Sequence, residues 1–160
     1  MEQSFNYGDE KFADIQMLRY RLNGFEQLTL NQKKYIYCLA KATLSGRDIT
    51  TDQFGRFNLK IRKLLEALYL LNKERVDGAD FSAMVVYLKR VWFSNGIHHH
   101  YGCDKFRPGF SEEWFRNLVD SSASSLAQKL GLKSAEEVKA WCEPLYPVIF
   151  DPTVLPKRVD

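Results

Sequence analysis

The chain has 160 residues, 45% of them hydrophobic, and its 23 basic and 20 acidic residues give a formal charge of +3. A chain of this length buries roughly 70% of its unfolded surface in one globular domain, so it needs no disulfides to be stable. The charge is too small and too evenly spread to predict nucleic-acid binding. No stretch approaches the ~20 apolar residues that a membrane-spanning helix needs. We therefore expect a soluble protein without nucleic-acid or membrane partners.

Helical periodicity dominates the first part of the chain. Apolar residues recur at three- and four-residue steps across residues 15–22, which predicts a first helix that ends before Gly24. A capping box formed by Thr29 and Gln32 indicates the start of a second helix. The polar, glycine-punctuated segment 45–57 is expected to be a loop that leads into a third helix.

The strongest helical pattern covers residues 80–95, and Gly96 follows as its terminator. Its apolar stripe consists of Phe81, Met84, Val85, Leu88, Val91 and Trp92. We expect the whole stripe to pack in the core, including Trp92, because aromatic residues on a helical apolar face are usually buried. In the preceding helix, the basic residues of segment 60–63 are expected to form a solvated face.

The C-terminal part also has helical patterns. Ser111, followed by two glutamates, opens a helix, and a separate short helix is expected over residues 124–130. Ser134 and Glu137 form a second capping box. Residues 147–160 contain three prolines without periodicity and are expected to form an irregular tail. The predicted fold is thus mainly α, a single domain of about six helices with long loops and no clear strand.

Three cysteines, Cys38, Cys103 and Cys142, are widely spaced and odd in number. Free thiols in a reducing compartment are the simplest explanation, because a chain of this size folds without disulfides. This slightly favours a cytoplasmic protein, although an export signal removed ahead of Met1 is also compatible with the sequence.

All the histidines lie together in segment 98–100, next to an aspartate and a cysteine. Three consecutive side chains cannot converge on one ion, and the spacing matches no standard zinc motif. His98 and His100 would share a face of an extended strand, with Cys103 or Asp104 as a third ligand only if the chain turned back at Gly102. We therefore expect no metal ligands here. Hydrogen-bonded histidines that fill polar gaps and histidines that line a cleft remain equally favoured.

Aromatic residues in a loop are better candidates for a binding surface than those on helical faces. Tyr101, Phe106 and Phe110 lie in such a loop, which also contains glycine and proline. The sequence contains no Walker loop, dinucleotide fingerprint or Ser-His-Asp arrangement. It therefore predicts a binding role for this loop and no catalytic residue.

Three stretches of the sequence together resemble the N-terminal region of dipeptidyl peptidase III of the bacterial type. They are residues 12–49, the helix "IRKLLEALYLL", and "YLKRVWFSNGIHHHYGCDKFRPGF". The last is the most specific, with a helix that ends in "FSNG" followed by an aromatic residue, a glycine, an acidic residue and "KF-x-P". The family consists of two-lobed, zinc-dependent exopeptidases, far longer than this chain, that release dipeptides from the N-termini of peptides.

The resemblance does not supply a metal site. The family binds zinc through H-E-x-x-G-H and a further glutamate, and the chain has neither, so no residue is assigned to zinc or to water activation. Positions that match the family loop are Ser94, Asn95, Gly96, Tyr101, Gly102, Asp104, Lys105 and Phe106. Since that loop borders the cleft between the lobes, the resemblance implies substrate contacts from Asn95, Tyr101, Gly102, Asp104, Lys105 and Phe106, with Tyr101 foremost.

The expected function is therefore that of a noncatalytic N-terminal segment, which supplies scaffold and cleft wall to a zinc-dependent dipeptidyl peptidase. Its partners would be the remainder of the parent polypeptide and a peptide substrate. Zinc would be bound only in the full-length protein, and the chain alone would be inactive. The alternative is a free-standing helical module that binds a protein or peptide, with a weak metal site at His98, His100 and Cys103 as a variant.

Overall fold

The computed structural model describes residues 5–158. Most of these residues lie in helices, so the mainly α class predicted from the sequence is confirmed. Contacts divide the chain after Asp48 into an N-terminal unit, described over residues 5–48, and a C-terminal unit, described over residues 49–158. Within the described residues, no helix combines the length and apolar character that crossing a bilayer requires.

The N-terminal unit begins with a β-hairpin where the sequence predicted a helix. Strands β1 (Gly8–Phe12) and β2 (Ile15–Leu18) pair antiparallel, and Ala13 turns the chain with a φ of 51°. The Gln16 side chain donates hydrogen bonds to two β1 carbonyls, at 3.1 and 3.4 Å, beside an irregularity in the strand register. The helix prediction was wrong because apolar spacing over so short a segment fits either structure, and pairing with β1 decides between them.

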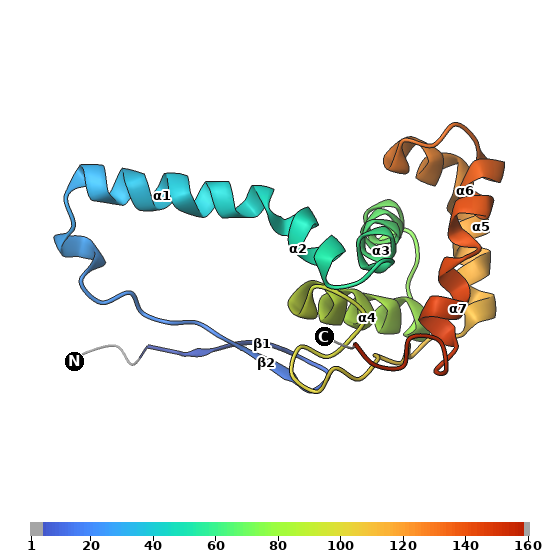
Figure 1. Cartoon of the computed structure of the whole chain (residues 1–160), viewed down its shortest axis with the longest axis horizontal. Helices are drawn as coiled ribbons and strands as arrows, with labels where there is room; N and C mark the ends of the chain where they lie inside the picture. Colours follow the sequence, from blue (N-terminus) through green and yellow to red (C-terminus); the bar gives the residue numbers. More distant parts are fainter. Residues whose placement is uncertain (1–4, 159–160) are drawn as a thin grey trace. The chain divides into compact units, whose positions relative to one another are not determined.

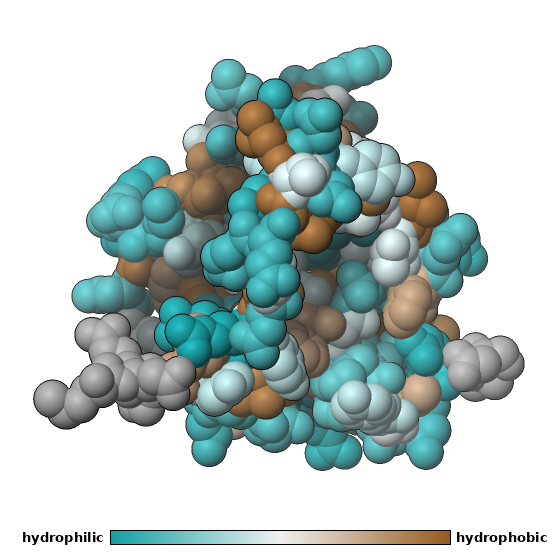
Figure 2. Space-filling view, turned by 90° about the vertical axis from the view of Figure 1, so that its left-hand side faces the viewer, coloured by the Kyte–Doolittle hydropathy of each residue, from teal (hydrophilic) through white to brown (hydrophobic). Residues whose placement is uncertain are grey.

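A short 3-10 helix, η1 (Phe25–Gln27), and helix α1 (Leu30–Ser45) complete this unit. The predicted capping box is present, since Thr29 Oγ1 accepts from the Gln32 backbone N–H and the Gln32 side chain accepts from the Thr29 N–H at 2.9 Å. No residue of α1 is buried. Its exposed large apolar residues are Leu30, Tyr35, Ile36, Tyr37, Leu39 and Leu44. Figure 2 shows apolar side chains, in brown, open to solvent among hydrophilic ones.

The segment expected to be a loop contains helix α2 (Arg47–Gln53). The Thr51 hydroxyl accepts a 2.7 Å hydrogen bond from the Arg62 guanidinium, which also pairs with Glu66 at 3.4 Å. Arg62 is only 2% exposed, so the prediction that this basic residue faces solvent was wrong. The Glu66 carboxylate offsets its buried charge and the Thr51 hydroxyl accepts from it, an arrangement that the local sequence pattern does not reveal.

The C-terminal unit is built on helices α3 (Asn58–Asn72), α4 (Ala79–Ser94) and α5 (Glu112–Leu130). Helix α3 packs against both α4 and α5 (Figure 1). The side chains that they bury together at no more than 1% exposure include Ile61, Leu64, Leu65, Leu68, Met84, Leu88, Val91, Phe115 and Leu126. This core is the platform from which the α4–α5 loop extends.

Trp92 is the exception in the predicted apolar stripe. It is 40% exposed, and its indole Nε1 donates a 2.7 Å hydrogen bond to Glu66 of α3. The prediction of a core position was wrong because Trp92 lies at the edge of the stripe. There the indole N–H reaches a partner at the surface, as tryptophan usually requires.

Helix α5 runs without a break to Leu130, whereas a separate helix was expected over residues 124–130. Its serine-rich segment stays helical because it packs closely on α3. Ser122 is 8% exposed, and its hydroxyl accepts a 3.1 Å hydrogen bond from the Asn72 side chain. Small residues allow such a close approach, so tertiary packing overrides their weak helix propensity.

Two short helices follow, α6 (Ala135–Cys142) and α7 (Leu145–Phe150). Half of the predicted capping box is present, since the Ser134 hydroxyl accepts from the Glu137 N–H at 3.2 Å, whereas the Glu137 carboxylate accepts from the Lys133 N–H at 2.6 Å and not from that of Ser134. The irregular tail begins at Asp151 and not at Pro147, which lies in α7. Proline is tolerated there because the first-turn N–H groups of a helix have no intrahelical acceptor.

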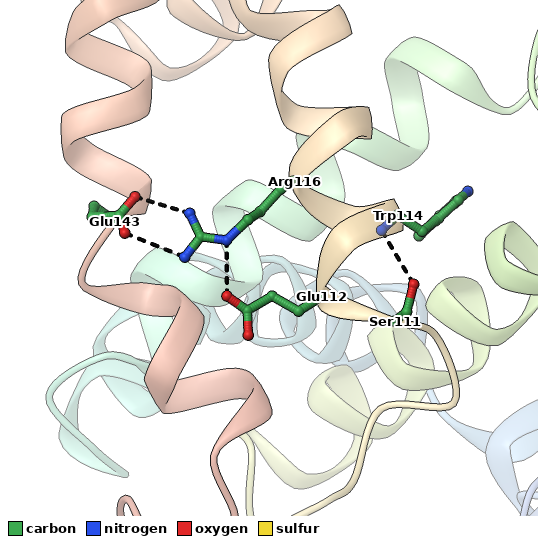
Figure 3. A network of polar contacts seen from close by, with 5 residues as sticks. All are labelled: Ser111, Glu112, Trp114, Arg116 and Glu143. Atoms are coloured by element: carbon green, nitrogen blue, oxygen red, sulfur yellow. Dashed lines mark hydrogen bonds and ion pairs between the residues drawn. The ribbon is translucent and has the colours of Figure 1, made fainter.

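Arg116 of α5 connects the first turn of its own helix with Glu143, the residue that follows α6 (Figure 3). Its guanidinium donates to Glu112 at 2.8 Å and to both carboxylate oxygens of Glu143 at 3.0 and 3.2 Å. It also lies 3.7 Å from the centre of the Tyr146 ring. The hydrogen bonds to Glu143, and after them the one to Glu112, raise the pKa of Arg116 above its ordinary value.

Candidate functional site

The candidate site is the α4–α5 loop, residues 95–111, whose first residues are anchored to α3. Asn95 caps α4 in a left-handed conformation with a φ of 54°. The buried Asn58 side chain lies directly against Gly96, where an added Cβ would stand 2.1 Å from Asn58 Nδ2. Asn58 Oδ1 accepts from the Ile97 N–H at 3.3 Å. The loop therefore leaves α4 in a direction set by close packing on Asn58.

Beyond this anchor, the loop folds back on itself as a narrow hairpin. The Phe106 N–H donates to the Ile97 carbonyl at 2.8 Å, and the His99 N–H donates to the Asp104 carbonyl at 2.8 Å. The Cys103 N–H closes the turn on the His99 carbonyl at 3.0 Å, with Cys103 itself at a φ of 58°. Residues 100–102 consequently form the tip of the hairpin.

The tail after α7 braces the returning side of this hairpin. The Lys105 N–H donates to the Pro156 carbonyl at 3.0 Å, and the Arg158 N–H donates to the Cys103 carbonyl at 2.9 Å. These bonds make residues 156–158 a third extended segment beside the loop, although they lie more than 50 positions along the chain from it. The sequence indicated an irregular tail and gave no sign of this pairing.

Lys105 also holds the tail through its side chain. Its ammonium donates to the carbonyls of Asp151 and Val154, at 2.6 and 2.8 Å. Burial lowers the pKa of Lys105, and the nearby Asp151 carboxylate partly opposes that change. Two of the three ammonium donors are thus engaged within the protein, so Lys105 contributes to the shape of the loop as well as to its charge.

Each histidine ring has its own partner. His98 Nε2 lies 2.8 Å from the Leu155 carbonyl, and His100 Nδ1 lies 3.2 Å from Ser94 Oγ. His99 Nδ1 accepts from the N–H groups of Tyr101 and Gly102, both at 3.1 Å. The histidines therefore fill polar gaps in and around the hairpin, which is one of the two roles expected from the sequence.

The variant in which His98, His100 and Cys103 bind a metal gains no support from this geometry. Across residues 5–158, no three side chains of histidine, cysteine, aspartate or glutamate gather closely enough to hold an ion. The Cys103 thiol lies 3.8 Å from the Tyr101 carbonyl, and His98 points to the tail.

A series of contacts between aromatic rings, one stacked and the others edge-on or tilted, leads to the hairpin tip. The Phe93 and His100 ring centres are 4.9 Å apart, His99 and His100 are stacked at 4.5 Å, and His100 and Tyr101 are 4.4 Å apart. Tyr101 at the end of this series is 86% exposed. An exposed phenol offers a flat apolar face and a hydroxyl, which suits contact with a peptide side chain.

The structure thus separates the six predicted contact residues. Tyr101 and Gly102 are exposed at the tip, whereas Asn95 lies at the base of the hairpin as the cap of α4. Asp104 is exposed and pairs with Lys157 at 3.5 Å. Phe106 is only 5% exposed, with the Arg90 guanidinium 5.2 Å from its ring centre. The six residues therefore do not form one continuous surface.

Phe106 belongs with Phe110, the other loop aromatic considered for binding, because both rings are 5% exposed and belong to the hydrophobic core. Only an edge of each ring reaches a groove beside α5.

Sequence reasoning missed Asn58 as the anchor of the loop, and it missed the pairing with the tail. Neither has a local signal, since the partners lie about 40 and 50 positions away along the chain.

Comparison with models of known protein families finds no match to this chain.

Proposed function

We propose that this chain is the noncatalytic N-terminal segment of a zinc-dependent dipeptidyl peptidase of the dipeptidyl peptidase III type, in which it supplies scaffold and one wall of the substrate cleft. Tyr101 carries the proposal. Its ring is 86% exposed on a hairpin that is braced by backbone hydrogen bonds on both sides. Because the backbone that carries this residue is already ordered, a peptide that packs on its ring loses less entropy on binding.

Helix α1 supports a role as part of a larger structure. At 3.6 residues per turn, Leu30 and Tyr37 lie on one side of the helix, and Tyr35 and Leu39 lie on the other. All four are at least 49% exposed. Helices that are apolar on opposite sides are normally buried between other elements. The remainder of a parent polypeptide would provide that cover.

The chain brings no catalytic groups to this function. Its three histidines are consecutive, and none is followed by glutamate, so the H-E-x-x-G-H zinc motif is absent from the sequence. Zinc and the activation of water would belong to the remainder of the parent polypeptide. The contribution of this segment is to position substrate, which affects binding more than bond breaking.

The proposal is tested first on the gene and then on the protein. The coding sequence after the codon for Asp160 should continue in frame to an H-E-x-x-G-H motif. The purified chain should not hydrolyse a dipeptidyl arylamide with or without zinc, whereas the extended polypeptide should. If no such motif follows, the free-standing interaction module becomes the better hypothesis. Zinc-dependent turnover that copurifies with the chain alone would contradict the assignment.

Substitution of Tyr101 tests the cleft role directly. In the extended polypeptide, Tyr101→Ala should raise KM more than it lowers kcat, because an aromatic contact distant from the scissile bond stabilises ground and transition states alike. Tyr101→Phe is the matched control, since it keeps the ring and removes only the hydroxyl. Unchanged KM in the alanine variant would show that the tip does not touch substrate.

A further inference from the structure

A second candidate site lies in a groove of about 610 Å³ in the C-terminal unit. It is bounded by residues 104–112, which lead into α5, and by the chain from the end of α7 through the tail. Its apolar floor consists of the half-buried Phe150 and the exposed edges of Phe106, Phe110 and Ile149. A volume of this size is typical of pockets for small ligands.

Two cations, Arg107 and Lys105, line this groove in addition to its ion pairs. Asp104 pairs with Lys157 at 3.5 Å, and Glu112 accepts at 2.8 Å from Arg116, a guanidinium that it shares with Glu143. Arg107 is exposed, and its guanidinium has no hydrogen-bonding or charged partner among residues 5–158. Arginine presents a planar fork of donors that matches a carboxylate.

Lys105 adds a second donor on the same rim. Its ammonium is held in place by two tail carbonyls, at 2.6 and 2.8 Å, and one of its three N–H donors remains for a ligand. Burial lowers the pKa of this ammonium. An anion in the groove would oppose that change, so the charged lysine and the anion would stabilise each other.

We propose that this groove binds the C-terminal end of a short peptide whose last residue is apolar. The side chain of that residue lies on the phenylalanine floor, and the terminal carboxylate pairs with Arg107 and Lys105. A terminal carboxylate fits better than an acidic side chain, because it shares a Cα with the apolar group. Neighbouring side chains of an extended peptide instead point to opposite faces. The proposal is independent of the peptidase assignment, since it uses neither Tyr101 nor any residue outside this chain.

The test is an NMR titration of the ¹⁵N-labelled full chain with three peptides. N-acetyl-Ala-Phe with a free carboxylate should bind with a Kd of about 1 mM or tighter and shift amide signals at the groove. Its C-terminal amide should bind about tenfold more weakly, because it lacks the charge-assisted hydrogen bonds. N-acetyl-Glu-Phe-amide, which carries its charge on a side chain, should be as weak as the amide. Equal binding of acid and amide, equal binding of the glutamate peptide, or no binding below about 10 mM would each overturn the proposal.

Two charge-removing variants locate the site. Arg107→Gln should weaken binding of the free acid to the level of the amide, with little effect on the amide itself. Lys129→Gln is the matched control, because it removes one exposed charge at the far end of α5, about 26 Å along the helix from the groove. Unchanged affinity for the acid in Arg107→Gln, or an equal loss in Lys129→Gln, would contradict the assigned site.

Discussion

Gly96→Ala should destabilise the C-terminal unit through a single steric conflict. The added Cβ would stand 2.1 Å from Asn58 Nδ2, whereas ordinary contacts begin at 3.4 Å, so the amide must move by about 1.3 Å. Asn58 is 3% exposed and cannot move outward. The φ of Gly96 is not positive, and alanine is therefore compatible with the backbone. The cost comes from packing alone.

The magnitude follows from three contributions. Overpacking a buried position costs roughly 1–3 kcal/mol. Displacing Asn58 also weakens its hydrogen bond to the Ile97 N–H, at about 1 kcal/mol. Replacing glycine restricts the unfolded chain, which returns about 0.4–1 kcal/mol. The expected loss in the free energy of unfolding is therefore about 2 kcal/mol.

Urea unfolding followed by tryptophan fluorescence measures this loss. All three tryptophans, at positions 92, 114 and 141, lie in the C-terminal unit, so the signal reports that unit. Repeating Gly96→Ala in an Asn58→Ala background should reduce its cost to near zero, because the clash is gone. Gly131→Ala is a control for backbone strain without a clash. No atom lies within 4 Å of the added Cβ, but the φ of 70° disfavours alanine. A loss below about 0.5 kcal/mol, or an undiminished loss in the Asn58→Ala background, would refute the reasoning.

Three further predictions concern packing, charge and thiol chemistry. Trp92→Ala should lower the free energy of unfolding by about 1–2 kcal/mol, because Trp92 is 40% exposed and its main polar contact is one hydrogen bond. Met84→Ala, at a fully buried site, should lower it by about 2–5 kcal/mol. Arg116→Met should lower stability by at most about 1 kcal/mol, since the guanidinium is 38% exposed, and the loss should shrink in high salt. Burial raises the pKa of the Cys142 thiol to about 12, so it should resist alkylation at pH 8 while the exposed Cys38 reacts.

Each of these has an outcome that contradicts it. Equal losses for the tryptophan and methionine variants, measured by urea unfolding, would place Trp92 in the core. A salt-independent loss at Arg116 would assign its effect to packing on the Tyr146 ring. Because the folded pKa of Cys142 is raised, its stabilising effect is present below the ordinary thiol pKa of about 8.5 and is lost as the pH rises. Stability that increases between pH 8 and 10 in the wild type, but not in Cys142→Ala, would contradict that sign.

Long periodic segments with capping residues were predicted correctly from the sequence. Helix α4 lies within one residue of the predicted 80–95, and Ser111 and Ser134 cap the helices that they were expected to open. These signals are local, because a helix hydrogen-bonds to itself and its caps lie within a few residues. The hairpin at residues 8–18 was missed because strand pairing needs a partner segment that periodicity does not identify.

For the candidate site, the sequence by itself determined which residues the loop contains, and the tertiary structure decided which of them face solvent. Tyr101 and Phe106 look equivalent as loop aromatics, yet they are 86% and 5% exposed. The difference arises because the loop folds back as a hairpin, anchored at its base by Asn58 and on its returning side by the tail. Those contacts join residues about 40 and 50 positions apart, and the free energy of such contacts depends on packing that no local pattern encodes.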